Sequence, residues 1–184
     1  QLAAQYHSAF NLETPTWRPS PDWGAKLGYS HDELRALNRE AVDFVKNIAR
    51  EFGSRARRIL ISGTIGPRGD GYRVENVMTI EQSQSYHELQ VQTFASSGVD
   101  LIEAVTMNYS DEAVGIVKAA ESSSIPVVIS FTVETDGRLP NGESLQEAIE
   151  KTDDTTGGYA AYFMINCAHP EHFKHVLKNA GNWK

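Results

Sequence analysis

The sequence predicts an α/β protein built from parallel strands. Short apolar segments alternate with longer stretches that have the spacing of amphipathic helices, and one helical stretch follows each clear strand. The predicted strands cover residues 58–62, 100–106, 127–133 and 162–166, with a candidate fifth at 9–12. The four clear strands begin 42, 27 and 35 residues apart. A complete eight-stranded α/β barrel uses roughly 30 residues per unit, so this spacing suits repeated βα units.

The strand segments are apolar, and residues 127–133 are rich in β-branched side chains, which suits strands buried on both faces of a parallel sheet. Two architectures fit repeated βα units: an open doubly wound sheet and a closed (β/α)₈ TIM barrel. A complete barrel needs roughly 250 residues, more than the 184 of this chain. No change in composition marks an internal boundary. Residues 1–184 are therefore predicted to form a single domain, an incomplete barrel in the second architecture.

The first long helix is predicted from the S-x-x-E pattern of Ser30 and Glu33, a capping box in which each residue satisfies a backbone N–H of the other. Apolar residues then recur at steps of three and four up to residue 52, and Gly53 supplies a stop. Residues 20–28, which precede this helix, are polar and rich in proline and glycine, so they are predicted to be a short loop.

Thr79 and Gln82 form a second capping box, for a helix that Gly98 ends. The remaining helices are predicted behind a Ser110 cap and ending before Pro126, at residues 144–152, and at residues 170–179, where Pro170 occupies the first turn and Gly181 follows.

Composition excludes several classes of protein. The chain has 17 basic and 24 acidic residues, a formal charge of −7 and a pI near 5.3, which argues against general binding to nucleic acids or anionic membranes. It has no apolar run of about 20 residues, and no basic-then-apolar pattern opens it, so neither a membrane span nor a signal peptide is expected in this sequence. With one cysteine, Cys167, no internal disulfide can form. We expect a soluble, cytoplasmic protein, and because Gln1 is not an initiator methionine, we expect residues before it.

Ligands of parallel α/β proteins bind beyond the carboxyl ends of the strands. Residues 62–72, after the first clear strand, contain four glycines and a proline, but they match neither a P-loop nor a dinucleotide-binding fingerprint. A structural loop is therefore favoured there over a phosphate site. Glu134 follows the strand at 127–133, and its carboxylate is equally consistent with an acid, base or ammonium-binding group and with a solvated loop acid. No lysine falls at a strand end, which argues against Schiff-base chemistry.

The last predicted strand leads into Cys167, and His169, His172 and His175 follow at three-residue steps. A Cys/His zinc site can be drawn from these residues. However, Pro170 interrupts the first pair and His175 would rotate away from His169 on a helix, so surface histidines are the favoured interpretation. A lone cysteine is also more often a small core residue than a ligand.

Four segments, in order, resemble the homocysteine S-methyltransferase family: residues 64–71, Tyr86-His87 with Gln90, residues 126–137, and above all residues 164–170, Met-Ile-Asn-Cys-Ala-His-Pro. Residues 14–18, Thr-Pro-Thr-Trp-Arg, are similar to the second strand and loop of that family. The resemblance covers nearly all of the chain and implies a (β/α)₈ barrel of which strands 2–6 are present.

The resemblance also implies a function. Members of the family transfer a methyl group from a sulfonium or betaine donor to the sulfur of homocysteine, which gives methionine, and three cysteine thiolates hold a zinc ion. By position Cys167 is the first of these ligands, with Asn166 beside it, and the other two form an adjacent pair after strand eight that this sequence does not contain. A lone Cys167 cannot hold a catalytic zinc, so the 184-residue polypeptide by itself is expected to be inactive. The implied partners are a small-molecule thiol and a methyl donor.

The candidate substrate-binding residues are Thr16, Thr64, Glu134 and Asn166. At the end of its fourth strand the family typically has a glutamate that binds the amino group of homocysteine, and Val105 takes that position here. Glu103 or Glu134 could replace it, or the substrate differs. Two other functions stay open: a non-catalytic binding module that has kept the barrel scaffold, and a metal-free lyase or isomerase with Glu134 as general base.

Overall fold

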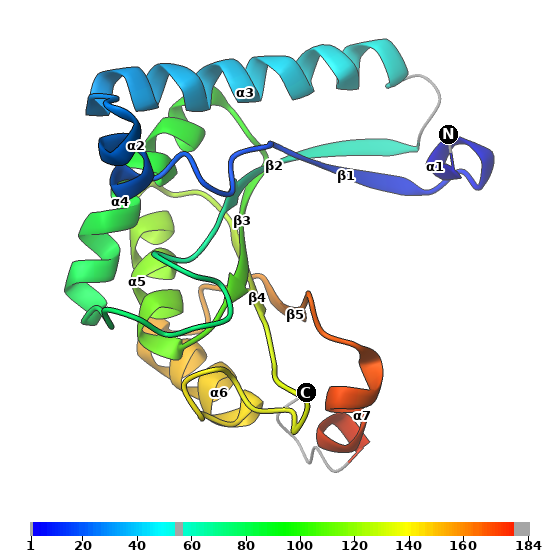
Figure 1. Ribbon diagram of the computed structural model, residues 1–184. Coiled ribbons are helices and arrows are strands. Elements are labelled where there is room, and N and C mark those ends of the chain that lie inside the picture. Colours follow the sequence, from blue (N-terminus) through cyan, green and yellow to red (C-terminus); the bar gives the residue numbers. More distant parts are fainter. Residues whose placement is uncertain (1, 54–56, 179–184) are drawn as a thin grey trace.

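The computed structural model describes residues 2–53 and 57–178 and contains one curled parallel sheet (Figure 1). Its strands are hydrogen-bonded in chain order: β1 (Ala9–Glu13), β2 (Arg58–Ile65), β3 (Leu101–Met107), β4 (Val127–Phe131) and β5 (Tyr162–Ile165). All four neighbouring pairs are parallel. A doubly wound sheet reverses its strand order at a switch point, and this sheet does not. The fold is therefore the partial (β/α)₈ barrel that the sequence predicts, and the doubly wound alternative was wrong.

Helices cover one face of the sheet. The chain contains α1 (Leu2–Gln5), α2 (Pro21–Leu27), α3 (His31–Phe52), α4 (Ile80–Ser97), α5 (Ser110–Ser122), α6 (Leu145–Thr156) and α7 (Pro170–Lys178). Figure 1 shows α3 to α6 along the convex side of the sheet. Right-handed crossovers between strands that follow one another place the helices that connect them on the same side of the sheet.

The hydrophobic core lies between the sheet and these helices. Phe94 of α4, Ile102 of β3, Val117 of α5 and Phe131 of β4 are all completely buried in it. The helices approach the strands closely: a Cβ atom on Gly63 would lie 2.5 Å from the ring of Phe94. Burial of apolar side chains on this outer face is the main favourable contribution to folding.

The concave face differs from the sequence expectation of strands that are apolar on both sides. Glu103 is almost completely buried there, and its carboxylate accepts hydrogen bonds from the Asn11 amide at 2.6 Å and the Ser62 hydroxyl at 3.0 Å. Burial raises the pKa of the nearby Glu13 carboxyl, and the charge of Glu103 raises it further. The interior of the partial barrel is therefore hydrogen-bonded and acidic, in contrast to the apolar outer face.

The predicted helix starts at Ser30 and Thr79 are confirmed, because both capping boxes are formed in full. Gly98 ends α4 in the left-handed conformation, as predicted. The predicted Ser110 cap was wrong. Ser110 is the first helical residue, and its hydroxyl instead donates to the Glu143 carboxylate at 2.8 Å. A long-range partner competes successfully with local capping at this position.

Several other boundaries differ from the prediction; β2 continues to Ile65 and α6 to Thr156, past the predicted ends at residues 62 and 152. Residues 21–27 form α2 instead of a loop, because Pro21 at the first turn is compatible with a helix start and Gly28 at φ 80° with its end. Gly53 has a right-handed φ of −57° and is no left-handed stop. The predicted strand 127–133 ends at Phe131. The predicted end of the last helix at Asn179 and Gly181 lies outside the described residues.

The two outer strands lead to a prediction about the 184-residue polypeptide. β1 and β5 each pair with one strand in the described chain, and Phe10 of β1 is 47% exposed. Exposed strand edges with apolar side chains pair with other chains. We expect the polypeptide to self-associate, and Phe10→Lys to reduce the association. Light scattering measures both, with Phe44→Lys on the exposed face of α3 as a matched control. A monodisperse monomer of the unmodified polypeptide would contradict this expectation.

Candidate functional site

The carboxyl ends of β3, β4 and β5 are joined by the side chain of Asn166. Its Oδ1 accepts hydrogen bonds from the backbone N–H of Thr106 at 2.9 Å and from the hydroxyl of Ser130 at 2.8 Å. Its Nδ2 donates to Thr106 Oγ1 at 2.9 Å and to Cys167 Sγ at 3.1 Å. Because a backbone N–H can only donate, it fixes the orientation of the amide. Both hydrogens and both lone pairs of the Asn166 amide are then used within the protein.

Two residues of this cluster have left-handed backbone conformations. Thr106 has φ 64° and Cys167 has φ 54°. A β-branched residue adopts this conformation only when its surroundings impose it. At Thr106 the constraint comes from Asn166, which binds both its N–H and its hydroxyl, and the β3–β4 register shifts between Ala104 and Met107. The strain therefore lies where β3 ends and the polar cluster begins.

Cys167 is exposed at the end of β5, so the structure does not place it in the core. Its sulfur is 3.9 Å from Thr106 Oγ1 and 3.1 Å from the Asn166 amide nitrogen. A side-chain hydrogen bond with this sulfur is the largest cause that raises the pKa of the Tyr72 phenol. Three polar groups from three segments of the chain thus surround one accessible thiol.

Two of the predicted substrate-binding residues brace β1 against β2. The Thr16 hydroxyl donates to the Thr64 carbonyl at 2.8 Å, and the Thr64 N–H donates to the Thr14 hydroxyl at 2.9 Å. The hydroxyls of Thr14 and Thr16 are 2.6 Å apart. The Thr16 hydroxyl is therefore occupied within the protein, whereas Thr64 Oγ1 is buried without a partner among the described residues.

Glu134 lies in a tight turn after β4, where its N–H donates to the Arg138 carbonyl and its carbonyl accepts from Gly137. Its side chain is exposed, and no bond of the Asn166 cluster involves it. At the position where the resemblance implies a glutamate, the Val105 carbonyl accepts from the Trp17 indole at 3.4 Å. Glu103, the other candidate for an ammonium contact, is occupied by Asn11 and Ser62 on the concave face.

The structure gives no support to a Cys/His zinc site. The rings of His169 and His172 are 6.0 Å apart, and His169 Nδ1 accepts from the backbone N–H of Glu171 at 3.3 Å. Within residues 2–53 and 57–178, no three His, Cys, Asp or Glu side chains lie close enough to hold a metal ion together.

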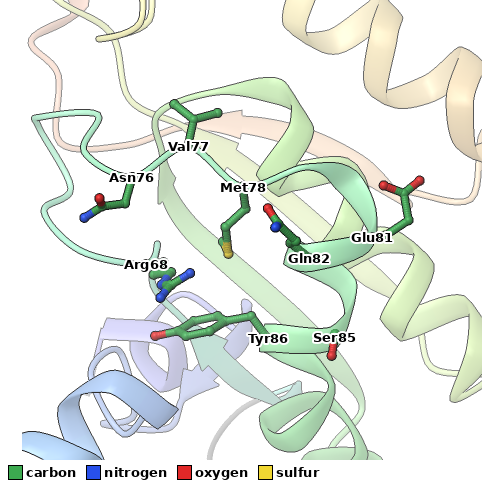
Figure 2. A pocket seen from close by; sticks show the side chains of 8 residues that line it. All are labelled: Arg68, Asn76, Val77, Met78, Glu81, Gln82, Ser85 and Tyr86. Carbon is green, nitrogen blue, oxygen red and sulfur yellow. The ribbon is translucent and has the colours of Figure 1, made fainter.

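A pocket of about 780 Å³ lies beside the 66–79 loop and the start of α4 (Figure 2). Arg68 and Tyr86 lie side by side in its lining, with the guanidinium carbon 4.9 Å from the ring centroid. The Arg68 Nε is also 2.7 Å from the Asp22 carboxylate, so its charge is paired. Cys167 does not line this pocket. The thiol site is therefore a separate feature.

Sequence reasoning missed several residues around the thiol. Tyr72 ends the glycine-rich segment that was singled out as a loop, but the segment alone gave no sign of its contact with Cys167. Thr106 carried no signal either, because a left-handed conformation is not expected for threonine.

His87 was noted in the sequence only through the family resemblance, and it lies apart from the thiol site. Its Nε2 is 2.9 Å from the Glu112 carboxylate, and both side chains are completely buried.

Fold and site together define a partial βα barrel with an accessible thiol at the carboxyl ends of its strands. The sequence profile of the family described as "Homocysteine S-methyltransferase" matches residues 7–184. The chain belongs to the homocysteine S-methyltransferase family.

Known proteins agree with this assignment. Homocysteine S-methyltransferase 1 of Arabidopsis thaliana is 26% identical over 170 residues, which cover 82% of this chain and 51% of that protein. Homocysteine S-methyltransferase 3 of the same plant is 29% identical over 136 residues, or 68% of this chain and 38% of that protein. The chain therefore spans about half or less of the length of these relatives.

Crystal structures of the homocysteine methyltransferase MmuM from Escherichia coli share the fold. The metallated form superposes with a TM-score of 0.80 at 21% identity, over 97% of this chain and 66% of that chain. The apo form gives a TM-score of 0.73 at 19% identity, over 97% and 65% of the two chains. No helix within the described ranges is long and apolar enough to cross a membrane.

The Asn166 cluster generates a stability prediction. Asn166→Ala removes four hydrogen bonds and leaves the Thr106 N–H without its partner, which should lower the free energy of unfolding by about 1–3 kcal/mol. Ser130→Ala removes one of the four and should cost about 0.5–1.5 kcal/mol. Urea denaturation of both variants measures the difference. Equal losses would contradict the central role of the amide.

Proposed function

We propose that this chain belongs to a zinc-dependent S-methyltransferase that acts on homocysteine or a similar thiol, with a sulfonium or betaine methyl donor. The observation that supports it most is the accessible Cys167 thiol, held by Asn166 where the loops after β2, β3 and β5 meet. We place this enzyme in the cytoplasm and in methionine biosynthesis. We also regard residues 1–184 as part of a single barrel domain.

The residues of this chain fit one part of a zinc site. A thiol is a soft ligand suited to zinc, and Cys167 is accessible at the mouth of the barrel, where parallel barrels bind their substrates. One cysteine in 184 residues cannot form a three-thiolate site, so the proposal concerns the protein in which further ligands are supplied. When bound, zinc acts as a Lewis acid that favours the thiolate form of the acceptor at neutral pH.

The other residues have different proposed roles. We assign Asn166 and Thr16 to positioning, since their side chains are occupied within the protein. Asn166 donates to the Cys167 sulfur and so fixes the direction from which that sulfur can bind a metal. The Thr64 hydroxyl has no partner within residues 2–53 and 57–178, and Glu134 has an exposed carboxylate, so these two stay candidates for contacts to substrate.

A non-catalytic binding module is the second candidate, and Val105 favours it. With valine at this position and Glu103 occupied by Asn11 and Ser62, the end of β3 presents no carboxylate to an ammonium group. Titration calorimetry of the full-length protein with homocysteine separates the two functions. Zinc-dependent binding supports the methyltransferase, and absent or zinc-independent binding supports the module.

Substitution in the full-length protein tests the roles of Cys167 and Glu134. Cys167→Ser should lower bound zinc well below one equivalent and reduce methyl transfer about 100-fold or more, since each thiolate ligand is needed to hold the metal. Glu134→Gln removes a charge without touching that ligand, so bound zinc should be unchanged and any effect should fall on KM. Metal analysis and turnover measure both. The metal-free lyase or isomerase would give the reverse: Glu134→Gln would abolish turnover, and Cys167→Ser would not.

A further inference from the structure

The loop formed by residues 66–79 is fixed at three points by side chains at the start of α5. The Glu112 carboxylate accepts from the Arg68 N–H at 2.6 Å, and the Asn108 amide donates to the Asp70 carbonyl at 2.9 Å. Near the far end of the loop, the Tyr109 hydroxyl accepts from the backbone N–H of Met78 at 3.2 Å. The loop therefore takes its position from α5, to which it is not adjacent in sequence.

The three anchoring side chains are buried, which makes release of the loop costly. Asn108 is 1% exposed, Tyr109 5% and Glu112 0%. Burial raises the pKa of the Tyr109 phenol and the charge of Glu112 adds to the effect, so the hydroxyl stays neutral. A buried group that loses its partner bears the full cost of desolvation, most of all a carboxylate. We expect one dominant position of the loop as a result.

Within the loop, two features place the backbone of Tyr72 beside the end of β3, where Thr106 Oγ1 is 3.9 Å from the Cys167 sulfur. The Asp70 carboxylate accepts from the backbone N–H of Tyr72 at 2.8 Å, a turn that fixes the peptide before the ring. Gly71 packs on the end of β3, where an added Cβ would lie 3.1 Å from Thr106 Cγ2 and 3.3 Å from Trp17 Cζ2. The loop can approach the strand this closely because residue 71 has no side chain.

We propose that Tyr72 limits access to the Cys167 sulfur, and that Asn108 is a positioning residue that holds Tyr72 in place through the Asp70 carbonyl. In this proposal the phenol covers the sulfur from the side of the loop and limits which ligands and substrates reach it from there. The inference rests on the proposed function only in treating the Cys167 sulfur as the functional group of the site.

The single cysteine allows a direct test. The rate of Cys167 modification by iodoacetamide is measured in the 184-residue polypeptide and in Tyr72→Ala, Asn108→Ala and the double variant. Each variant is compared on the high-pH plateau of its own pH–rate profile, where the rate no longer changes with pH and reports access to the sulfur. Each single variant should react about three times faster or more, and the double variant no faster than Tyr72→Ala, because residues that act through one contact are not additive. Tyr29→Ala, at an exposed tyrosine between α2 and α3, is the control and should leave the rate unchanged.

An unchanged rate in Tyr72→Ala would overturn the proposal, as would factors that multiply in the double variant. If Asn108→Ala fails to fold, Gly71→Ala replaces it. The added methyl group pushes the loop from Thr106 without removing a buried polar group, so it should also raise the rate, and an unchanged rate would count equally against the proposal. The assay needs neither zinc nor methyl transfer. Its failure would therefore leave the proposed function standing, and loss of the proposed function would leave its result unaffected.

Discussion

The amide of Asn166 is the interaction on which the thiol site depends. One planar group accepts from β3 and β4 and donates to β3 and to Cys167, so it holds three strand ends at a fixed separation. In a flat sheet, strands separated by a third strand lie about 9.5 Å apart, too far for one amide to bridge. The curl of the partial barrel brings the ends of β3 and β5 together, and the amide makes that curvature part of the site.

The two faces of the sheet serve different purposes. Apolar side chains such as Phe94 and Ile102 pack outward against the helices and supply most of the stability. The concave face contains Glu103 with Asn11 and Ser62, whose hydrogen bonds offset the cost of burying a carboxylate. A side chain on this face can be exchanged without disturbing the helix packing, because successive residues of a strand point to opposite sides. Specificity can change on this scaffold while the fold persists.

Local patterns in the sequence were sufficient to predict much of the fold. Capping boxes such as Ser30 with Glu33 depend on residues three apart, and the apolar strand segments depend on neighbours, so both can be read from short stretches. The choice between a barrel and a doubly wound sheet required the strand order, which no local pattern contains. Ser110 shows where local patterns fail. A local cap was expected, but its hydroxyl binds Glu143, 33 residues away in the sequence.

The site was less predictable, because most of its contacts join residues far apart in the sequence. Asn166 and Cys167 could be found because they are adjacent and end a strand, whereas Tyr72 and Thr106 reach the thiol across 95 and 61 residues of chain. The positions of Tyr72 and Thr106 are linked by the short segment from Thr106 to Glu112. Its first residue is bound by Asn166, and its later residues hold the loop that carries Tyr72. Because the end of β3, with its left-handed Thr106, is continuous with the first turn of α5, a shift at either end would move both sides of the thiol site together. A substitution in this segment should therefore affect the site more strongly than one of equal burial elsewhere on α5, even though none of its later residues touches the sulfur.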